Sequence, residues 1–547
     1  MVYSTGRTTF LIALGLFSVV FLFLGLAITE WGFLHDDYGT IWHAAQITSW
    51  NDFLKLFSNP GMHSVVQPSN CVLPEQSFFV VIYRPLACVL HALQIFFFGF
   101  FAHKHFLFTI FFHAINTALL FFLYSRLLSR NAAIWGAAFF AFHLSGWDWL
   151  GWISGQTHII TLTMMLLLSI MTFYFIQTKK PILLGGIGLL HLVALFFREK
   201  PIVFPVLLIL IYLFYRKNFP VTAHLKPVIL VTTITNLCYL VIRNIFYPME
   251  AERQGGNFII KLFTDFIGSI PDRFFDAVTY IVDITNLAWM PGGNRLFKGI
   301  AIICMTMLLG FILAHRVKLK EIVFCFLSMC LLMWPMLVRH YSSRYLYCAL
   351  PVLCLLFALA LTDSDQQSPR FFAFKKTMLW FFLIFSMTML PLHLKSRGQI
   401  LNTYNQAFIT LAADKSLFHK EICFIALPYD FFTTGNAQAL WMYELPTNTP
   451  VYYDRRTFTW TKPLLATNLL DIKKIETGFR LSSKDSSQLW FLPLDQSTNM
   501  GEIIVNAKDQ KSGNISSMDF ILYPVWLKKD LVFITWDQKK QNFKFLP

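Results

Sequence analysis

The chain has 547 residues, of which 56% are hydrophobic and only 14% are charged. Soluble domains carry about 25% charged residues, so this composition excludes an ordinary soluble domain and predicts a polytopic membrane protein. The formal net charge is +15. Because much of this charge lies in short clusters at the ends of apolar runs, it indicates membrane topology and no nucleic-acid partner. The nine cysteines are scattered without a CxxC pair, which is typical of thiols in a core or facing lipid.

Apolar stretches of helical length recur through residues 1–394 and predict about eleven transmembrane helices. The first stretch, Thr9 to Thr29, is longer than a signal-peptide core and has no evident cleavage site, so we expect a retained anchor. The predicted spans are 8–29, 104–124, 131–145, 157–176, 182–197, 201–215, 226–247, 296–314, 320–337, 345–361 and 376–393.

Basic clusters orient these spans. They fall on alternate loops, at Arg7, Arg126 with Arg130, Lys179 with Lys180, Arg216 with Lys217, residues 315–320, and Arg370 with Lys375 and Lys376. The positive-inside rule then places the amino terminus in the cytoplasm and the tail outside. Of the acidic residues before position 394, only Glu321, Asp363 and Asp365 fall on predicted cytoplasmic loops. Acidic residues contribute little to topology, so their gathering on the outer side indicates a polar site there.

Two long outer loops and the tail complete the predicted organisation. Residues 30–103 and 248–295 contain apolar-aromatic stretches whose period predicts amphipathic helices lying in the membrane interface. From about 395 the composition becomes more polar, and short β-like runs such as "GEIIVNA" and "DLVFITW" appear. We therefore expect a mainly α membrane bundle over 1–394 and a small β-rich α+β extracytoplasmic domain over 395–547.

The adjacent carboxylates of Asp36 and Asp37, here called the aspartate pair, follow the first span. One interpretation is a helix cap, since Asp is a preferred N-cap and a short helix is expected near Gly39. In the other, one carboxylate is a general base, and its neighbour holds a partner or a metal and raises the pKa of the base. Metal dependence stays open, because the pair with His35 and His43 suits either a divalent cation or hydrogen bonds.

Several basic and acidic residues fall on the same predicted face. Arg84 precedes Pro85 and is either an interfacial snorkelling arginine or a bidentate phosphate contact. Trp147, Trp149 and Trp152 are typical of an interfacial belt, but Asp148 between them needs a partner. Two tight outer turns, each also explicable as a solvated or interfacial turn, carry the remaining candidates: Arg198, Glu199 and Lys200 in the first, and Arg339, His340, Arg344, Tyr345 and Tyr347 in the second.

Six segments in order resemble GT-C superfamily glycosyltransferases, the integral-membrane enzymes that use polyprenyl-phosphate sugars. Within that class the chain most resembles the tetratricopeptide-containing transmembrane O-mannosyltransferases and their bacterial relatives. The resemblance covers residues 1–360, through the aspartate pair, "YRPL" (83–86), "HAINTALLF" (113–121), "FAFHLSGWDWLGWISGQ" (140–156), "REKPIVFP" (198–205) and "SRYLY" (343–347). Two positions depart from it: Asp148 stands where those relatives often have Glu, and Ser343 replaces an acidic residue.

The resemblance implies a helical bundle, a lipid-phosphate donor entering from the bilayer and a catalytic carboxylate in the aspartate pair. The tail has no 34-residue repeats, so recognition of a protein acceptor through such repeats is not supported, and a bacterial inner-membrane enzyme is favoured. The expected roles are the base for Asp36 or Asp37, with Asp36 preferred. Donor phosphate contacts fall to Arg84, Arg198, Lys200 and Arg344, and acceptor or supporting contacts to Asp148, Tyr83, Glu199 and His340.

The predicted function is therefore transfer of a hexosyl, mannosyl or pentosyl group from a polyprenyl-phosphate donor to a protein, lipid or glycan acceptor, with inversion. A transporter or flippase is the main alternative, and it requires ionisable residues near the bilayer midplane and paired interrupted helices. The strongest charge in this sequence lies instead at predicted outer helix ends. A non-catalytic scaffold presenting residues 395–547 would leave the clustered acids and arginines unexplained.

Overall fold

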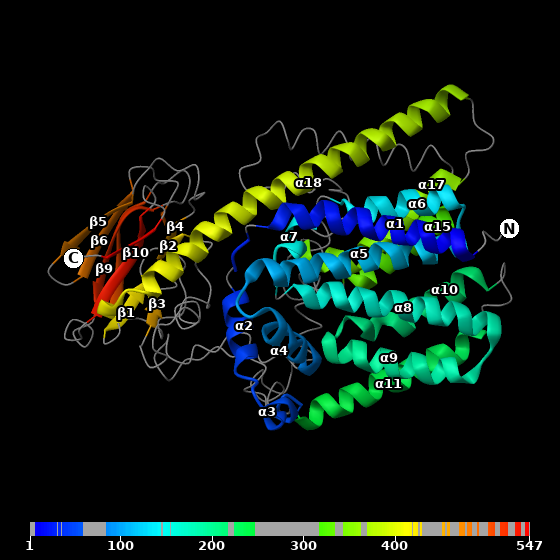
Figure 1. The fold of residues 1–547 in the computed structure, drawn as a ribbon, viewed down its shortest axis with the longest axis horizontal. Coiled ribbons are helices and arrows are strands. Elements are labelled where there is room, and N and C mark those ends of the chain that lie inside the picture. The colour runs from blue at the N-terminus through cyan, green and yellow to red at the C-terminus, as the bar shows by residue number, and fades with distance from the viewer. Residues whose placement is uncertain are drawn as a thin grey trace.

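The computed structural model describes the chain in two parts, a helical bundle and a strand-rich carboxyl-terminal part (Figure 1). The described residues of the helical part are 6–29, 31–33, 36–57, 84–143, 146–153, 155–216, 224–246, 317–333, 343–362 and 369–417. Those of the strand-rich part are 420–424, 427–428, 451–453, 457–459, 470–475, 478–483, 489–491, 501–508, 515–522, 531–537 and 542–545.

Most predicted spans coincide with helices. The α-helices are α1 (Gly6–Gly25), α2 (Asp36–Ala45), α3 (Trp50–Lys55), α4 (Pro85–Phe98), α5 (Ala102–Leu127), α6 (Arg130–Ala141), α7 (Gly146–Leu150), α8 (Gln156–Thr178), α9 (Pro181–Phe197), α10 (Phe204–Tyr215), α11 (Leu225–Phe246), α15 (Leu319–Leu332), α17 (Leu350–Thr362) and α18 (Pro369–Ala412). Short 3-10 turns are η1 (Leu26–Ile28), η3 (Lys200–Val203), η6 (Ser343–Cys348) and η8 (Lys415–Leu417). The predicted span 296–314 lies outside the described residues.

Helix length and composition identify a multi-pass membrane protein. Within the described residues, four helical stretches are long and apolar enough to cross a bilayer: Arg7–Ile28, Ala102–Leu127, Gln156–Thr178 and Leu225–Ile245. Further apolar helices are shorter, at Pro85–Phe98, Pro181–Phe197, Lys200–Tyr215 and Leu346–Ala360. These helices run side by side through the bundle (Figure 1).

Helix α4 shows that polar groups face inward. It buries His91 and Gln94, whereas Leu93, Phe96 and Phe97 are more than half exposed. A helix in water would place these residues the other way round, so this pattern indicates that the outer surface of α4 faces lipid.

The stretch 41–57 differs from the predicted interfacial helices. It is divided between α2 and α3, and α2 is packed inside the protein against α4, with Tyr38, Ile41 and Ala44 buried. Only α3 keeps exposed apolar side chains, Trp50 and Leu54. The second predicted interfacial stretch, within 248–295, lies outside the described residues.

Helix α18 is longer than predicted. It continues without a break through Pro391 and past position 394, where the predicted domain boundary lies, as far as Ala412. Figure 1 shows it crossing the bundle obliquely and leading on to the strands, and it contacts η1, α7 and β11. The aspartate pair, α4 and α7 all lie at the end of the bundle that faces these strands (Figure 1).

The strand-rich part contains two sheets. Its strands are β1 (Glu421–Phe424), β2 (Leu427–Pro428), β3 (Val451–Tyr453), β4 (Thr457–Thr459), β5 (Leu470–Ile475), β6 (Gly478–Ser483), β7 (Leu489–Phe491), β8 (Gly501–Lys508), β9 (Ile515–Leu522), β10 (Leu531–Asp537) and β11 (Asn542–Phe545). One sheet has the order β11-β10-β1-β3, and the other has the order β2-β4-β7-β9-β6-β5 with β8 paired to β9. Ile422 of β1 and Ile534 of β10 are fully buried and belong to the same hydrophobic cluster as the bundle.

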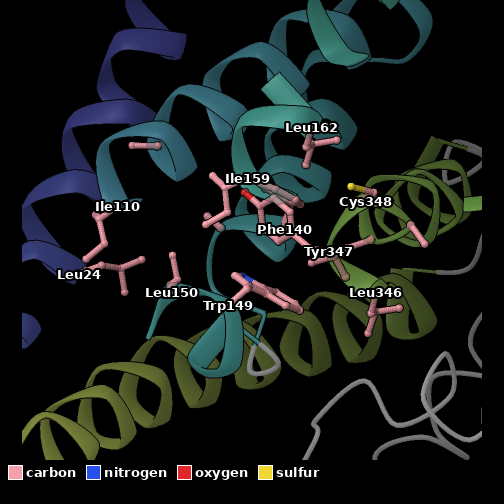
Figure 2. Close-up of a cluster of buried hydrophobic side chains, with 14 of the residues drawn as sticks. Leu24, Ile110, Phe140, Trp149, Leu150, Ile159, Leu162, Leu346, Tyr347 and Cys348 are labelled. Atoms are coloured by element: carbon pink, nitrogen blue, oxygen red, sulfur yellow. The ribbon is translucent and has the colours of Figure 1, made fainter. Parts of the chain in front are cut away.

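Buried aromatic side chains pack between η6 and helices α6, α7 and α8. Figure 2 shows Phe140, Trp149, Ile159 and Tyr347 converging from α6, α7, α8 and η6. The rings of Trp149 and Tyr347 meet edge to face, with 4.9 Å between centroids, and both side chains are fully buried. This packing holds η6, the turn that carries Arg344, against α7 and α8.

Candidate functional site

Asp37 is fully buried in the first turn of α2. One oxygen of its carboxylate, Oδ1, accepts a hydrogen bond of 2.9 Å from the main-chain N–H of Ile153. Asp37 therefore ties α2 to the segment between α7 and α8, 116 residues away. The described bond of Asp37 is therefore a tertiary contact that joins α2 to that segment.

Asp36 opens α2, although its side chain lies outside the described side chains. The same holds for the side chains of Asp148 in α7 and Arg344 in η6. Tyr83 and His340 fall outside the described residues altogether. For these five residues the structure gives at most the position of the main chain, and their expected roles stay predictions.

The chain that follows Ile153 also contacts the first outer turn, Arg198, Glu199 and Lys200, here called the basic turn. Thr157, in the first turn of α8, accepts a hydrogen bond of 2.7 Å from Nη1 of Arg198. Arg198 is 7% exposed and caps α9 at its carboxyl end. Ile153 thus contacts Asp37, and Thr157, four positions later in the chain, contacts Arg198.

Arg84 and Glu199 form an ion pair between α4 and the same basic turn. Nε and Nη2 of Arg84 both donate to Oε2 of Glu199, at 3.2 and 2.9 Å. Burial raises the pKa of Glu199, but the charge and hydrogen bonds of Arg84, together with the charge of Arg198, outweigh this effect and lower the pKa to about 2. Glu199 is therefore ionised at every physiological pH and is not suited to be a general base.

Lys200 completes the basic turn and is 4% exposed. Its ammonium group lies near the thiol of Cys348, at the end of η6, and within electrostatic range of Arg198 and Arg84. The Cys348 thiol in turn approaches the carbonyl oxygen of His158, at 3.8 Å. The carboxyl end of η6, at Cys348, therefore lies close to Lys200 of the basic turn and to α8.

The resulting cation cluster consists of Arg84, Arg198 and Lys200 with the carboxylate of Glu199. Its three cationic side chains share one described carboxylate within the cluster, that of Glu199. Like charges held together in apolar surroundings raise the free energy, and an anion bound among them lowers it. Guanidinium groups bind phosphate through paired hydrogen bonds, so a phosphate is the anion that fits this chemistry.

Two buried hydrogen-bond networks support the cluster. Gln94 of α4 donates to Gln156 of α8 at 2.8 Å, and Gln156 donates to Thr109 of α5 at 2.7 Å. Asn116 donates to the hydroxyl of Tyr347 at 3.0 Å, and that hydroxyl also hydrogen-bonds Nδ1 of His113 at 2.9 Å. The first network fixes the helices that bear Arg84 and Thr157, and the second fixes η6.

Of these supporting residues, only Tyr347 was among the predicted candidates. Gln94, Gln156 and Thr157 are polar residues in apolar stretches, which is a signal that sequence could have used, because polar groups inside a membrane bundle need partners. Ile153 contributes its main-chain N–H, which nearly every residue type has, so the sequence could not indicate this contact. Among the described residues, no group of three or more His, Cys, Asp and Glu side chains is placed to hold a metal ion. His35, and the side chains of Asp36 and His43, on which the metal expectation rested, lie outside those described.

The fold and the site thus define a multi-pass membrane protein with a cation cluster, of which Arg198 and Lys200 are buried and Arg84 and Glu199 are part-buried, and with a fully buried carboxylate, Asp37. No family model matches the sequence, and no curated protein matches it. One similar solved structure is the crystal structure of ArnT from Cupriavidus metallidurans bound to undecaprenyl phosphate, with a TM-score of 0.45 and 11% identity over 80% of this chain and 85% of that one. Another is the archaeal oligosaccharyltransferase AglB from Archaeoglobus fulgidus in complex with an inhibitory peptide and a dolichol-phosphate, with a TM-score of 0.42 and 10% identity over 80% of this chain and 64% of that one. At these scores neither likeness carries an argument about this chain.

The Arg84–Glu199 pair makes stability depend on pH in a defined direction. Because the pKa of Glu199 falls from an ordinary value of 4.5 to about 2 on folding, the pair stabilises the protein above about pH 4.5 and loses this effect as the pH falls toward 2. The difference in melting temperature between wild type and Glu199→Gln should therefore stay constant from about pH 5 to 8 and shrink below about pH 4.5. Thermal unfolding of the purified protein in detergent checks this, and a difference that grows on acidification would contradict it.

Proposed function

We propose that the chain is an integral-membrane glycosyltransferase that moves a sugar from a polyprenyl-phosphate donor to an acceptor hydroxyl on the outer face of the membrane. The observation that carries the proposal is the largely buried cation cluster at one end of an apolar helical bundle, linked to Asp37 through the chain between Ile153 and Thr157. A phosphate carried by a membrane lipid can reach such a cluster from the headgroup region while its polyprenyl chain stays in the bilayer. Charge-assisted hydrogen bonds are about twice as strong as neutral ones, so the cluster is suited to hold it.

Asp36 is the proposed general base. It accepts the proton of the acceptor hydroxyl while the hydroxyl oxygen attacks the anomeric carbon of the donor sugar. The bond between the anomeric carbon and the phosphate oxygen breaks, and its electron pair leaves with the polyprenyl phosphate. A single displacement of this kind inverts the anomeric centre.

Asp37 is proposed to position rather than to react, because its described oxygen is already engaged by the N–H of Ile153. Successive residues of a helix point about 100° apart, so Asp36 and Asp37 project in different directions from α2. Anchoring Asp37 therefore fixes the direction in which Asp36 projects.

The leaving phosphate gains negative charge as the glycosidic bond breaks. Arg84, Arg198 and Lys200 are proposed to stabilise that charge, with Arg344 joining them from η6 and Glu199 holding Arg84 in place. Asp148, Tyr83 and His340 remain proposed acceptor or supporting contacts. The sugar class, hexosyl, mannosyl or pentosyl, and the acceptor class, protein, lipid or glycan, are open to the experiment below.

The proposed setting is a bacterial inner membrane with a cytoplasmic amino terminus. Residues 1–394 form the proposed catalytic unit and residues 395–547 the extracytoplasmic one, joined by α18, which continues across that boundary. The end of the bundle that bears the aspartate pair is then the outer end. We also propose that the aspartate pair, with His35 or His43, could bind a divalent metal at this site.

A transfer assay with the purified full-length protein tests the proposal. Polyprenyl phosphates that carry labelled hexose or pentose are incubated with the protein and with membranes that supply acceptors, and label in the acceptor is measured together with released polyprenyl phosphate. Wild type should transfer label from at least one donor, and Asp36→Asn should not. Movement of intact donor between leaflets of proteoliposomes without transfer would overturn the proposal in favour of a flippase.

A further inference from the structure

The segment that carries the aspartate pair is clamped onto α18 at points on both sides of the pair. Gly398 of α18 lies under the indole of Trp31, so that a Cβ at this position would fall 2.1 Å from two atoms of the ring. Gly32, which precedes the pair, lies equally close to α18, since a Cβ at this position would fall 2.5 Å from the carbonyl oxygen of Leu401. Two glycines, one on each element, thus allow the two main chains to meet.

The second contact follows the pair directly. The hydroxyl of Tyr38 donates to Oδ1 of Asn405 at 3.1 Å, and the ring of Tyr38 meets that of Phe408 at 5.4 Å. Tyr38 is 3% exposed and Phe408 is 1% exposed. This contact therefore fixes the residue adjacent to Asp37 in the first turn of α2.

The α18 residues involved form one line along the helix, here called the α18 stripe: Gly398, Leu401, Asn405 and Phe408. Their spacing of three and four residues places them on a single helix face. Glycine inside a helix destabilises it relative to alanine, so Gly398 needs a packing reason, and the indole of Trp31 provides one. The carboxyl end of α18, just beyond the stripe, leads through η8 to β1, whose Ile422 belongs to the hydrophobic cluster of the bundle.

We propose that the α18 stripe is a positioning element for the aspartate pair. By holding Trp31 and Gly32 before the pair and Tyr38 after it, the stripe sets where the base stands relative to the cation cluster. A shift of α18 against the bundle is transmitted to the pair, because the close glycine contacts leave no free space to absorb it. This inference rests on the proposed function for its activity readout alone.

Gly398→Ala tests the stripe directly, and Gly15→Ala is its matched control. Both replace a glycine within an α-helix, but a Cβ at Gly15 meets no atom within 4 Å. Gly398→Ala should lower kcat by about 10- to 100-fold and change the donor KM by no more than about threefold, since misplacing a reacting group by about 1 Å has effects of this size.

Hydrogen exchange gives a readout that does not depend on activity. Main-chain amides of Asp36–Ala45 should exchange faster in Gly398→Ala than in Gly15→Ala. If wild type transfers no sugar from any donor, the proposed function fails, and exchange still decides the positioning role. Wild-type kcat and wild-type exchange in a folded Gly398→Ala protein would overturn the inference, as would equal losses in Gly15→Ala.

A second pair of variants covers the case in which Gly398→Ala does not fold. Tyr38→Phe removes one hydroxyl, and Asn405→Leu removes its acceptor. Each should lower kcat by about three- to tenfold, and the double variant should lose no more than either single one. Additive losses in the double variant would show that the hydrogen bond is not the link and would overturn its part in the positioning.

Discussion

Replacing Asp36 by asparagine should lower kcat by about 10²- to 10⁴-fold, the range that general-base catalysis supplies. The amide cannot accept the proton of the acceptor hydroxyl, whereas the donor is held by the cation cluster, so the donor KM should stay within about threefold of wild type. Initial rates at several donor concentrations separate the two constants. Membrane insertion and melting temperature should match those of wild type.

Asp37→Asn is the matched control for Asp36→Asn. Asparagine keeps an oxygen that accepts the hydrogen bond from the N–H of Ile153, although the bond is weaker to a neutral acceptor. We expect a loss of about tenfold, corresponding to roughly 1.4 kcal/mol. A larger loss in Asp37→Asn than in Asp36→Asn would move the role of the base to Asp37. Full activity in both variants would refute the assignment of the pair.

Arg84→Met should raise the donor KM by about 10- to 100-fold, because a phosphate in apolar surroundings loses a charged hydrogen-bond donor that water does not replace. Lys104→Met is the control, since Lys104 is an exposed cation on α5, outside the cluster. The same change of charge at Lys104 should leave the donor KM within about twofold. Donor titrations of the three proteins provide the comparison, and equal effects in the two variants would indicate a long-range charge effect instead of a phosphate contact.

The double variant Arg84→Met with Glu199→Gln tests whether Glu199 only orients Arg84 or also contributes to donor binding by itself. If Glu199 acts only by orienting Arg84 through Oε2, removing it in the absence of Arg84 should change the donor KM no further. An additional rise in KM for the double variant would give Glu199 a role of its own in the site. A lowered KM would show instead that the Glu199 carboxylate repels the donor.

Most of the described helices of the bundle could be predicted from the sequence, because bilayer thickness sets the length of an apolar span. The end of α18 could not be predicted from composition. Polar residues appear from Lys395 onward where the helix passes the predicted boundary, and a change of composition was interpreted as a change of fold. Pro391 did not end the helix either, since α18 continues beyond it to Ala412.

The sequence indicated only the ionisable residues of the candidate site. Arg84, Arg198, Glu199 and Lys200 were selected as ionisable residues on the predicted outer side, and the structure brings them together. Their pairing was not predictable, because Arg84 and Glu199 lie 115 positions apart and no local pattern links them. Gly32 and Gly398 gave no signal, since the reason for each glycine is an atom on a distant element.

The hydrogen bond from Ile153 to Asp37 has a consequence for genetics. Its donor is a main-chain N–H, so every substitution of Ile153 except proline leaves the donor in place. An alanine scan or a saturation library would report the fully buried Ile153 as an ordinary apolar position, sensitive to size and polarity. Only the contrast between Ile153→Pro and the other substitutions at that codon would reveal that the segment holds an aspartate.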